Sequence, residues 1–232
     1  MTQEQTMINI VDTEKNICLD LDSTLIYSIF NEDDIEILSK DESLKDRIKI
    51  IEVVDIDDNS PIGKGELSKI CVVLRPHVDA FITFCKCYFD KIYIWSAGHQ
   101  RYVRAIVNVL FENTLSDIEG DYFVFKCNNP DKVYTRENCI IEEDNIFKPF
   151  SHYGLDFKRT IMIDDRKDTF SKNAENGILI PAYKPKHTQK SILKDEDSLL
   201  TLIKWFNTVE FRTCDDVRSL NKKNIFPKSK KK

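Results

Sequence analysis

The chain has 232 residues, of which 41% are hydrophobic and 14 are phenylalanine, which suits one large packed domain and excludes overall disorder. Its formal net charge of −5 argues against wholesale nucleic-acid binding. The seven cysteines form no C-x-x-C pair, and no apolar run reaches the length of a membrane span or resembles a secretory signal. We therefore expect an intracellular protein, nuclear or cytoplasmic, with reduced thiols and no membrane contact.

The first buried strand is predicted to begin near Ile17, after a polar segment at residues 1–15, and to run into two acids, Asp20 and Asp22. A strand that is apolar on both faces is typical of a parallel sheet, whose ligands bind beyond the carboxyl ends of the strands. There, one carboxylate can attack a phosphoryl group while its neighbour transfers protons. Such crowded acids need a cation, for which Mg²⁺ is the usual partner. The alternative is a strand that ends in a solvated turn.

Residues 27–70 differ from the rest of the chain in their acidity. A strand is predicted at residues 48–54 and a turn at residues 57–65. We interpret the segment as an acidic insertion after the first strand, a solvated flap that could cover or select substrate. Its acids are Glu32, Asp33, Asp34, Glu36, Asp41, Glu42, Asp55, Asp57 and Asp58.

Strands and helices then alternate, which predicts an α/β fold with a parallel sheet. The strands are expected at residues 71–74, 91–95, 122–125, 159–163 and 178–180. The helices are expected at residues 78–89, 102–110, 169–175, 198–206 and 215–220. Residues 16–220 therefore form one domain. The lysine-rich residues 221–232 are predicted to be a mobile tail, with an import signal or a docking arm as the alternative.

Two further strand ends carry polar side chains. Ser96 and Ala97 follow the strand at residues 91–95, where a hydroxyl and backbone N–H groups can bind an anion or merely cap a helix. Asp164 and Asp165 end or follow the strand at residues 159–163. Acids at two strand ends and a hydroxyl at a third suit phosphoryl transfer through aspartate with a metal ion.

Cations near these acids are candidates for balancing their charge and for binding substrate. Lys148 is the candidate lysine, with Lys158 as its rival, and Arg136 is a second cation in the same region. The sequence contains no Walker-type loop, no zinc-ligand spacing, no serine-hydrolase elbow and no cysteine-phosphatase motif.

In order along the chain, these residues resemble the four motifs of the haloacid dehalogenase superfamily: Asp20-x-Asp22-x-Thr24, Ser96, Lys148 and Asp164-Asp165. A closer resemblance is to the FCP/SCP-like phosphatases of the RNA polymerase II carboxy-terminal domain. It is carried by Arg75-Pro76-His77-Val78, Trp95-Ser96-Ala97-Gly98, Arg136-Glu137-Asn138-Cys139 and Ile163-Asp164-Asp165-Arg166. The resemblance covers about residues 16–220 and is weakest in the acidic insertion, where we recognise none of the family's peptide-binding aromatic residues.

The resemblance implies a Rossmann-like fold and a role for each matching residue. Asp20 would attack phosphorus and bind Mg²⁺, and Asp22 would act as general acid and base and offer the metal its backbone carbonyl. The other implied roles are metal binding by Asp164 and Asp165, charge stabilisation by Lys148, and substrate binding by Thr24, Ser96, Ala97 and Arg136.

The expected function is that of a Mg²⁺-dependent protein serine/threonine phosphatase acting through an aspartyl-phosphate on phosphopeptides like the polymerase tail. One alternative is a phosphatase of the same superfamily that acts on small molecules or nucleic-acid ends. The acidic insertion beside the site disfavours nucleic acid, because it would repel a polyanion. Another alternative is a catalytically idle binding module, which the intact acids argue against.

Overall fold

The computed structural model describes residues 13–56, 63–111 and 129–226. The strand predicted at residues 122–125, most of the polar segment at 1–15 and the end of the lysine-rich tail lie outside the described residues. Among the described helices, none combines the length and the apolar character that crossing a bilayer requires.

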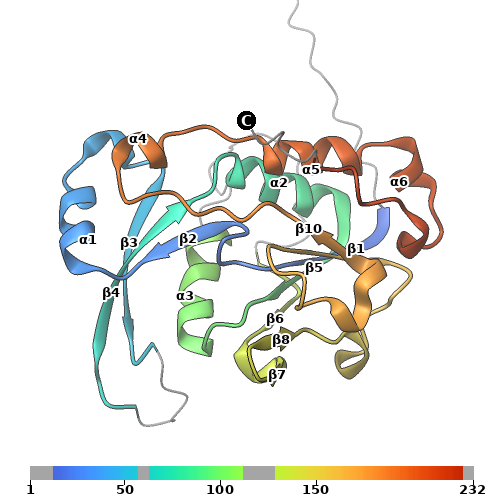
Figure 1. Cartoon of the computed structure of the whole chain (residues 1–232), viewed down its shortest axis with the longest axis horizontal. Helices are drawn as coiled ribbons and strands as arrows, with labels where there is room; N and C mark the ends of the chain where they lie inside the picture. Colours follow the sequence, from blue (N-terminus) through green and yellow to red (C-terminus); the bar gives the residue numbers. More distant parts are fainter. Residues whose placement is uncertain (1–12, 57–62, 112–128, 227–232) are drawn as a thin grey trace, which may run out of the picture.

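The main sheet has five parallel strands in the order β10-β9-β1-β5-β6, which confirms the predicted α/β fold (Figure 1). The central strand β1 pairs with β5 through Leu19 and Ile94, and with β9 through Leu19 and Ile163. The carboxyl ends of these three strands therefore lie at one edge of the sheet. The strands are β1 (Thr13–Leu19), β5 (Phe89–Trp95), β6 (Lys132–Tyr134), β9 (Thr160–Asp164) and β10 (Gly177–Leu179).

Both faces of this sheet are covered, which explains why its central strands have no polar alternation. On one face, Leu19, Ile94 and Ile163 belong to the core that includes side chains of α2 (Val78–Tyr88), α3 (Gln100–Phe111) and α5 (Ser198–Phe206). On the other face, Cys18, Trp95 and Met162 pack in a separate cluster with side chains such as Phe150 and Phe170. Alternate residues of one strand thus enter two cores.

The acidic segment is not the solvated flap that its composition suggested, because it forms most of a second sheet. Three antiparallel strands lie in the order β2-β4-β3 and carry helix α1 (Glu32–Ser39). They are β2 (Ile26–Ile29), β3 (Ile48–Val54) and β4 (Leu67–Leu74), so the strand predicted at residues 71–74 begins earlier and is antiparallel. Three of the acids, Glu32, Asp33 and Asp34, lie in the first turn of α1, where the helix dipole favours negative charge.

This second sheet has its own small core, built from apolar residues spaced between the acids. Two residues of that core come from a distant part of the chain, the segment after β10 (Figure 1). The core consists of Ile29, Ile35, Leu38, Leu44, Ile48, Cys71, Val73, Tyr183 and Ile192.

Short elements complete the described chain. A two-stranded ribbon is formed by β7 (Ile140–Glu142) and β8 (Asn145–Phe147), and two short helices are α4 (Gln189–Ile192) and α6 (Val209–Thr213). The helices predicted at residues 169–175 and 215–220 are 3₁₀ turns, Ser171–Asn176 and Val217–Ser219. Other 3₁₀ turns are Glu42–Leu44, Arg136–Asn138 and Phe150–Tyr153.

Candidate active site

The loop after β1 is a tight turn that begins at Asp20. The Asp20 N–H still donates to the Ile163 carbonyl of the neighbouring strand, at 3.0 Å. The chain then wraps around Leu21, whose carbonyl accepts from the N–H groups of the three residues at 24–26. Ser23 has a left-handed φ of 61°, which serine adopts at a cost, so this turn is held by its surroundings.

A buried lysine joins the acids at two strand ends. The Nζ atom of Lys148 lies 2.7 Å from Asp20 Oδ1 and 2.6 Å from Asp164 Oδ2. All three side chains are buried. Lys148 follows β8, and its N–H donates to the Thr169 carbonyl at 2.7 Å, which fixes the backbone that carries it. The geometry therefore brings Lys148 to the acids.

The charges in this group depend on one another. Burial, and then the nearby Asp164 carboxylate, raise the pKa of Asp20 to about 8 despite its bond to Lys148. Burial alone would lower the pKa of Lys148, but Asp164 and Asp20 raise it above its ordinary value. Lys148 therefore stays charged, and a single cation does not fully offset the surrounding acids.

Oxygen ligands for a hard cation gather at the same place. Asp20, Asp164 and Asp165 each offer a carboxylate oxygen, and these oxygens lie within 4.8 Å of one another. Burial, and then Asp164, raise the pKa of Asp165, as expected for crowded acids. Both oxygens of Asp164 are already engaged, because Oδ2 accepts from Lys148 and Oδ1 accepts from the Arg166 N–H at 2.8 Å. This donor set fits Mg²⁺, which prefers carboxylate oxygens.

Asp22 has partners of its own. The Tyr102 hydroxyl donates to Asp22 Oδ1, and it lies 2.7 Å from the Ser28 hydroxyl. The Ser96 hydroxyl also bonds to Asp22, although burial is the stronger influence and raises the pKa of this carboxyl. Tyr102 begins the helix that was predicted at residues 102–110, and the sequence analysis assigned it no role at the site. Its contact with Asp22 follows from the packing of α3.

These side chains line a cleft of about 490 Å³ at the carboxyl edge of the main sheet. It brings together Asp20, Asp22, Ser96, Ala97, Lys148, Asp164 and Asp165. Two cations to which the sequence analysis assigned no role also line it, Arg166 and Lys184. Lys158, the alternative to Lys148, lines a different hollow with Lys15, Arg159 and Arg212. That hollow lies beside the start of β1, away from the cleft.

Two of the expected substrate-binding residues lie outside the cleft. Thr24 is fully buried behind the loop, and its hydroxyl has no hydrogen-bond partner among the described residues. Arg136 is exposed, and its Nη1 atom lies 3.4 Å from the Ala97 carbonyl. Arg136 lines an adjoining groove of about 680 Å³, which shares Asp22, Ala97 and Gly98 with the cleft.

The groove has an aromatic wall. Phe30 is 54% exposed, and its ring centroid lies 6.3 Å from that of Tyr102. Ile56 and His99 also line it. We recognised no such aromatic residue from the sequence, because Phe30 directly follows β2 and meets Tyr102 of α3 only in the folded chain.

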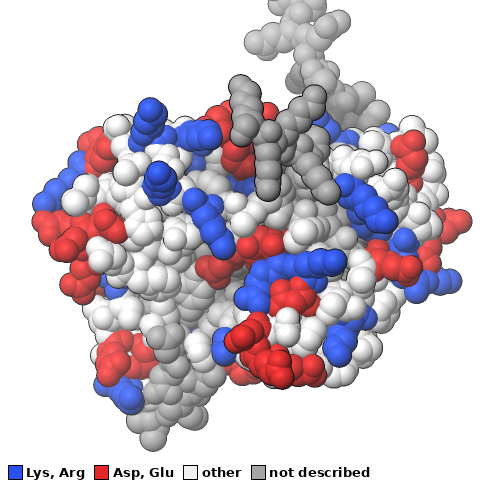
Figure 2. Space-filling view, in the orientation of Figure 1, with Lys and Arg blue, Asp and Glu red and all other residues white. Residues whose placement is uncertain are grey.

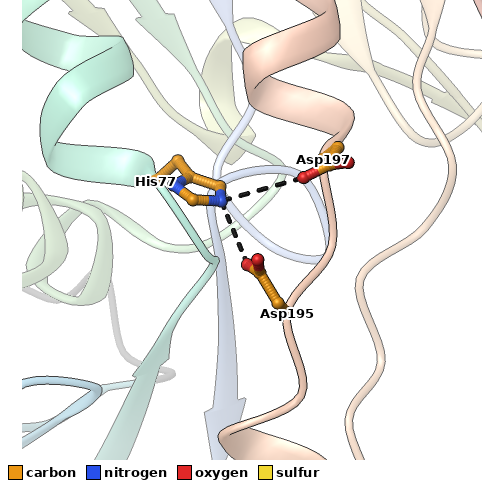
Figure 3. A group of neighbouring side chains, drawn as sticks. All are labelled: His77, Asp195 and Asp197. Carbon is orange, nitrogen blue, oxygen red and sulfur yellow. Dashed lines mark ion pairs between the residues drawn. The ribbon is translucent and has the colours of Figure 1, made fainter.

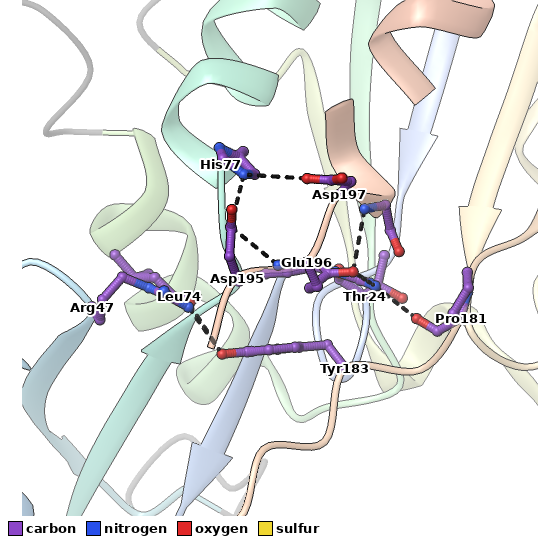
Figure 4. A network of polar contacts seen from close by, with 11 residues as sticks. Thr24, Arg47, Leu74, His77, Pro181, Tyr183, Asp195, Glu196 and Asp197 are labelled. Carbon is purple, nitrogen blue, oxygen red and sulfur yellow. Dashed lines mark hydrogen bonds and ion pairs between the residues drawn. The ribbon is translucent and has the colours of Figure 1, made fainter. Parts of the chain in front are cut away.

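A buried arginine holds the loop after β1 against the second half of the chain. Arg75 donates through Nη1 to the Thr24 carbonyl and through Nη2 to the Pro181 carbonyl, both at 2.9 Å. It also forms an ion pair with Glu196. Burial alone would raise the pKa of Glu196, but the bonds from Arg75 help to lower it below its ordinary value. Figure 4 shows Thr24, Pro181 and Glu196 converging at this point.

The residues on either side of Glu196 contact the start of α2. His77 Nε2 lies 3.0 Å from Asp195 Oδ1 and 4.0 Å from Asp197 Oδ1 (Figure 3). Both aspartate side chains are largely exposed, at 72% and 74%, so these pairs contribute at most about 1 kcal/mol each. The buried Arg75–Glu196 pair is therefore the stronger of the contacts between the start of α2 and residues 195–197.

We predict that Glu196→Gln lowers the free energy of unfolding by about 2 kcal/mol, because it leaves the buried Arg75 guanidinium without its counter-charge. Glu210→Gln, an exposed change on α6, serves as the control. Chemical denaturation of both variants checks this expectation. Equal stability of the two variants would show that the Thr24 and Pro181 carbonyls stabilise the buried Arg75 without a counter-charge.

Comparison with known proteins shows the family of this chain. The family model described as "NLI interacting factor-like phosphatase" matches residues 15–218. The human CTD small phosphatase-like protein is 24% identical over 207 residues, covering 89% of this chain and 59% of that protein. A probable C-terminal domain small phosphatase of Dictyostelium discoideum is 26% identical over 169 residues, covering 73% of this chain and 44% of that protein. The chain thus spans less than two thirds of either relative.

Solved structures show the same fold. A structure of the fission yeast RNA polymerase II CTD phosphatase Fcp1 bound to beryllium fluoride matches with a TM-score of 0.51 and 19% identity, covering 74% of this chain and 42% of that one. Another structure of Fcp1 matches with a TM-score of 0.53 and 17% identity, covering 83% of this chain and 50% of that one. The family match spans nearly the whole described fold, including every acid of the cleft, and the chain therefore belongs to the NLI interacting factor-like phosphatases of the haloacid dehalogenase superfamily.

Proposed function

We propose that this protein is a Mg²⁺-dependent protein serine/threonine phosphatase that works through a phosphorylated aspartate. The observation that carries the proposal is the contact of Lys148 with both Asp20 and Asp164, beside an Asp22 that is bonded to Tyr102. A nucleophile, its balancing cation and a separate proton donor are thus held at one edge of the sheet. Membership of a phosphatase family supports the same conclusion.

In the first step, a carboxylate oxygen of Asp20 attacks phosphorus, and the bond from phosphorus to the serine or threonine oxygen breaks. Asp22 donates its proton to that leaving oxygen, a role that suits a carboxyl whose pKa is raised by burial. The Tyr102 hydroxyl holds Asp22 in place. Lys148 offsets negative charge on Asp20 and on the transferring group.

In the second step, water attacks the phosphoryl group, and the bond from phosphorus to Asp20 breaks. Asp22, now ionised, accepts the proton of the water and is ready for another cycle. The N–H of Gly98 donates to the Ser96 hydroxyl at 3.0 Å, which orients that hydroxyl beside Ala97 in the cleft. This orientation supports a role for Ser96 and the backbone around Ala97 in binding phosphate oxygens.

The residues that would hold Mg²⁺ are Asp20 and Asp165, with the backbone carbonyl of Asp22 as a further oxygen. Asp164 contributes mainly through Lys148, because its two oxygens are engaged. When bound, the ion supplies charge neutralisation at the phosphoryl oxygens.

We predict that hydrolysis of an aryl phosphate requires added Mg²⁺ and stops with EDTA. Because the ion must displace protons from Asp20, whose pKa is raised to about 8, the Mg²⁺ concentration for half-maximal activity should fall as the pH rises from about 6 toward 8. Titration of Mg²⁺ at several pH values checks this. Full activity after exhaustive chelation would contradict the proposal.

A peptide substrate is favoured over a small molecule by the groove beside the cleft. The exposed Phe30 ring, Ile56 and Tyr102 offer apolar surface to a residue next to the phosphorylated one, and Arg136 can contact the peptide or its phosphate. The human relative described above is named for the CTD, so phosphopeptides like the polymerase tail are the proposed substrates.

A substrate panel tests this assignment. The panel contains phosphoserine heptad peptides of the polymerase tail, unrelated phosphopeptides, sugar phosphates and 3′-phosphorylated oligonucleotides. We expect the highest kcat/KM on heptad peptides, and Phe30→Ala should lower that value about tenfold while sparing an aryl phosphate, as loss of one anchoring aromatic does. Higher efficiency on sugar phosphates or oligonucleotides would reject the protein-phosphatase assignment.

A further inference from the structure

A basic segment leads away from the cleft. Residues 181–194, here called the lysine strap, form most of the connection between β10 and α5 and pass over the second sheet (Figure 1); the acidic residues 195–197 complete that connection. The strap contains four lysines and no acidic residue. All four lysines are exposed, and none forms an ion pair with another of the described residues. They are Lys184, Lys186, Lys190 and Lys194.

The strap begins at the cleft itself. Lys184 lines the cleft with Asp165, whose pKa it acts to lower against the stronger effects of burial and Asp164. Lys186 follows at a distance of at most about 7 Å between Cα atoms, the reach of two residues. Figure 2 shows basic side chains running from a central acidic group toward the region where Figure 1 draws α4. Positive charge thus extends from the cleft across this face.

The strap is held in place by the elements beneath it. The Tyr183 N–H donates to the carbonyl of Ser23 in the loop after β1, at 2.7 Å. His187 Nδ1 lies 2.6 Å from Asp34 Oδ2 of α1, and Gln189 donates to the Ser43 hydroxyl at 2.8 Å. Ile192 is buried in the core of the second sheet. The lysines are therefore presented on an ordered backbone, which reduces the entropy lost on binding.

We propose that the lysine strap binds a second phosphate of the substrate, so that multiply phosphorylated polypeptides are preferred. This proposal rests on the proposed phosphatase function, because it assigns a substrate class to the same cleft. In an extended peptide, residues two apart are separated by about 6.6 Å, which matches the step from Lys184 to Lys186. A phosphate about two to four residues from the one in the cleft, carrying about −1.5 to −2 charges, meets the strap.

The chemistry favours a phosphopeptide over a nucleic acid. The strap lies against α1, whose first turn carries Glu32, Asp33 and Asp34, and only Asp34 is paired with the strap, through His187. A continuous polyanion that followed the strap would also pass these acids and be repelled. One or two separate phosphates can meet the lysines without reaching α1.

The test compares two triple variants with the same change in charge. The strap variant is Lys186→Gln/Lys190→Gln/Lys194→Gln, which leaves Lys184 in the cleft. The control variant is Lys91→Gln/Lys158→Gln/Lys204→Gln, whose exposed lysines lie outside both the cleft and the groove. Three peptides are compared. One carries a single phosphoserine, and the other two carry a second phosphoserine placed three residues before or three residues after the first. Their hydrolysis is measured with each protein, and their binding is measured by fluorescence anisotropy with Asp20→Asn added, so that turnover does not interfere.

We expect about three- to tenfold tighter binding, and higher kcat/KM, for at least one doubly phosphorylated peptide over the singly phosphorylated one. The preference should be lost in the strap variant, be kept in the control variant and weaken with salt. The proposal is overturned if no preference exists, if the strap variant keeps it, or if an oligonucleotide of equal charge displaces the peptide more readily.

These outcomes distinguish failure of the strap proposal from failure of the proposed phosphatase function. Hydrolysis of phosphopeptides without any strap-dependent preference would leave the phosphatase assignment standing and reject the strap. A strap-dependent preference in binding, with no phosphopeptide hydrolysed by the unmodified protein, would support the strap and reject the assignment.

Discussion

Asp20→Asn is expected to abolish turnover and to give no phosphorylated protein with any substrate. An amide cannot form the acyl-phosphate, so the reaction has no first step. The substitution also removes one carboxylate from the acids around Lys148, which relieves crowding, so folding should be unaffected or improved. Acid-quench labelling with a ³²P-substrate and thermal denaturation measure the two effects. Residual hydrolysis above about one part in 10³ would point to a different nucleophile.

Asp22→Asn is the matched comparison, because the nucleophile remains while the proton donor is lost. The amide oxygen at this position would still accept from Tyr102, but the side chain could not protonate a leaving oxygen or activate water. We expect slow phosphorylation of Asp20 by a substrate with a good leaving group, followed by even slower release of phosphate. The labelled protein should therefore accumulate. Equal behaviour of the two variants would contradict the division of roles.

Lys148→Ala should lower kcat by about 10²-fold or more, the usual effect of losing one group that stabilises charge in the transition state. The structure adds a second expectation, because removal of this lysine leaves Asp20 and Asp164 buried without a cation. The pKa of Asp20 should then rise further. The pH at which the remaining activity rises should therefore be higher than in the unmodified protein. A pH profile of kcat/KM with an aryl phosphate measures this shift.

Lys158→Ala is the control for this prediction. Lys158 is exposed beside the start of the main sheet and lines a hollow that shares no residue with the cleft. Its removal should leave kcat, KM and the pH profile unchanged. A large effect of Lys158→Ala with a silent Lys148→Ala would mean that Lys158, and not Lys148, supplies the balancing charge.

Sequence patterns were sufficient for four strands of the main sheet, β1, β5, β9 and β10, and for the acids that follow β1 and β9, but they did not predict β6 (Lys132–Tyr134). Residues 17–19 before Asp20 and residues 161–163 before Asp164 are continuously apolar, because parallel strands covered on both faces have no solvent side. Parallel strands also align their carboxyl ends, so acids at two strand ends had to lie close together. The same patterns failed for the acidic segment. Its many charged residues suggested a solvated flap. Its fold depends instead on a few apolar residues, such as Ile29 and Ile35, that are spaced between the charged ones.

The contacts between elements distant in the chain were decided only by the tertiary structure. Tyr102 meets Asp22 across 80 residues, and Phe30 joins Tyr102 in one groove. No periodicity encodes such pairs, because a helical pattern identifies the face that is buried but not the side chain that it will touch. The strap is a further case, since its lysines resemble ordinary surface residues until folding brings Lys184 into the cleft. Local spacing determined where chemistry could occur, and long-range packing decided which neighbours would take part.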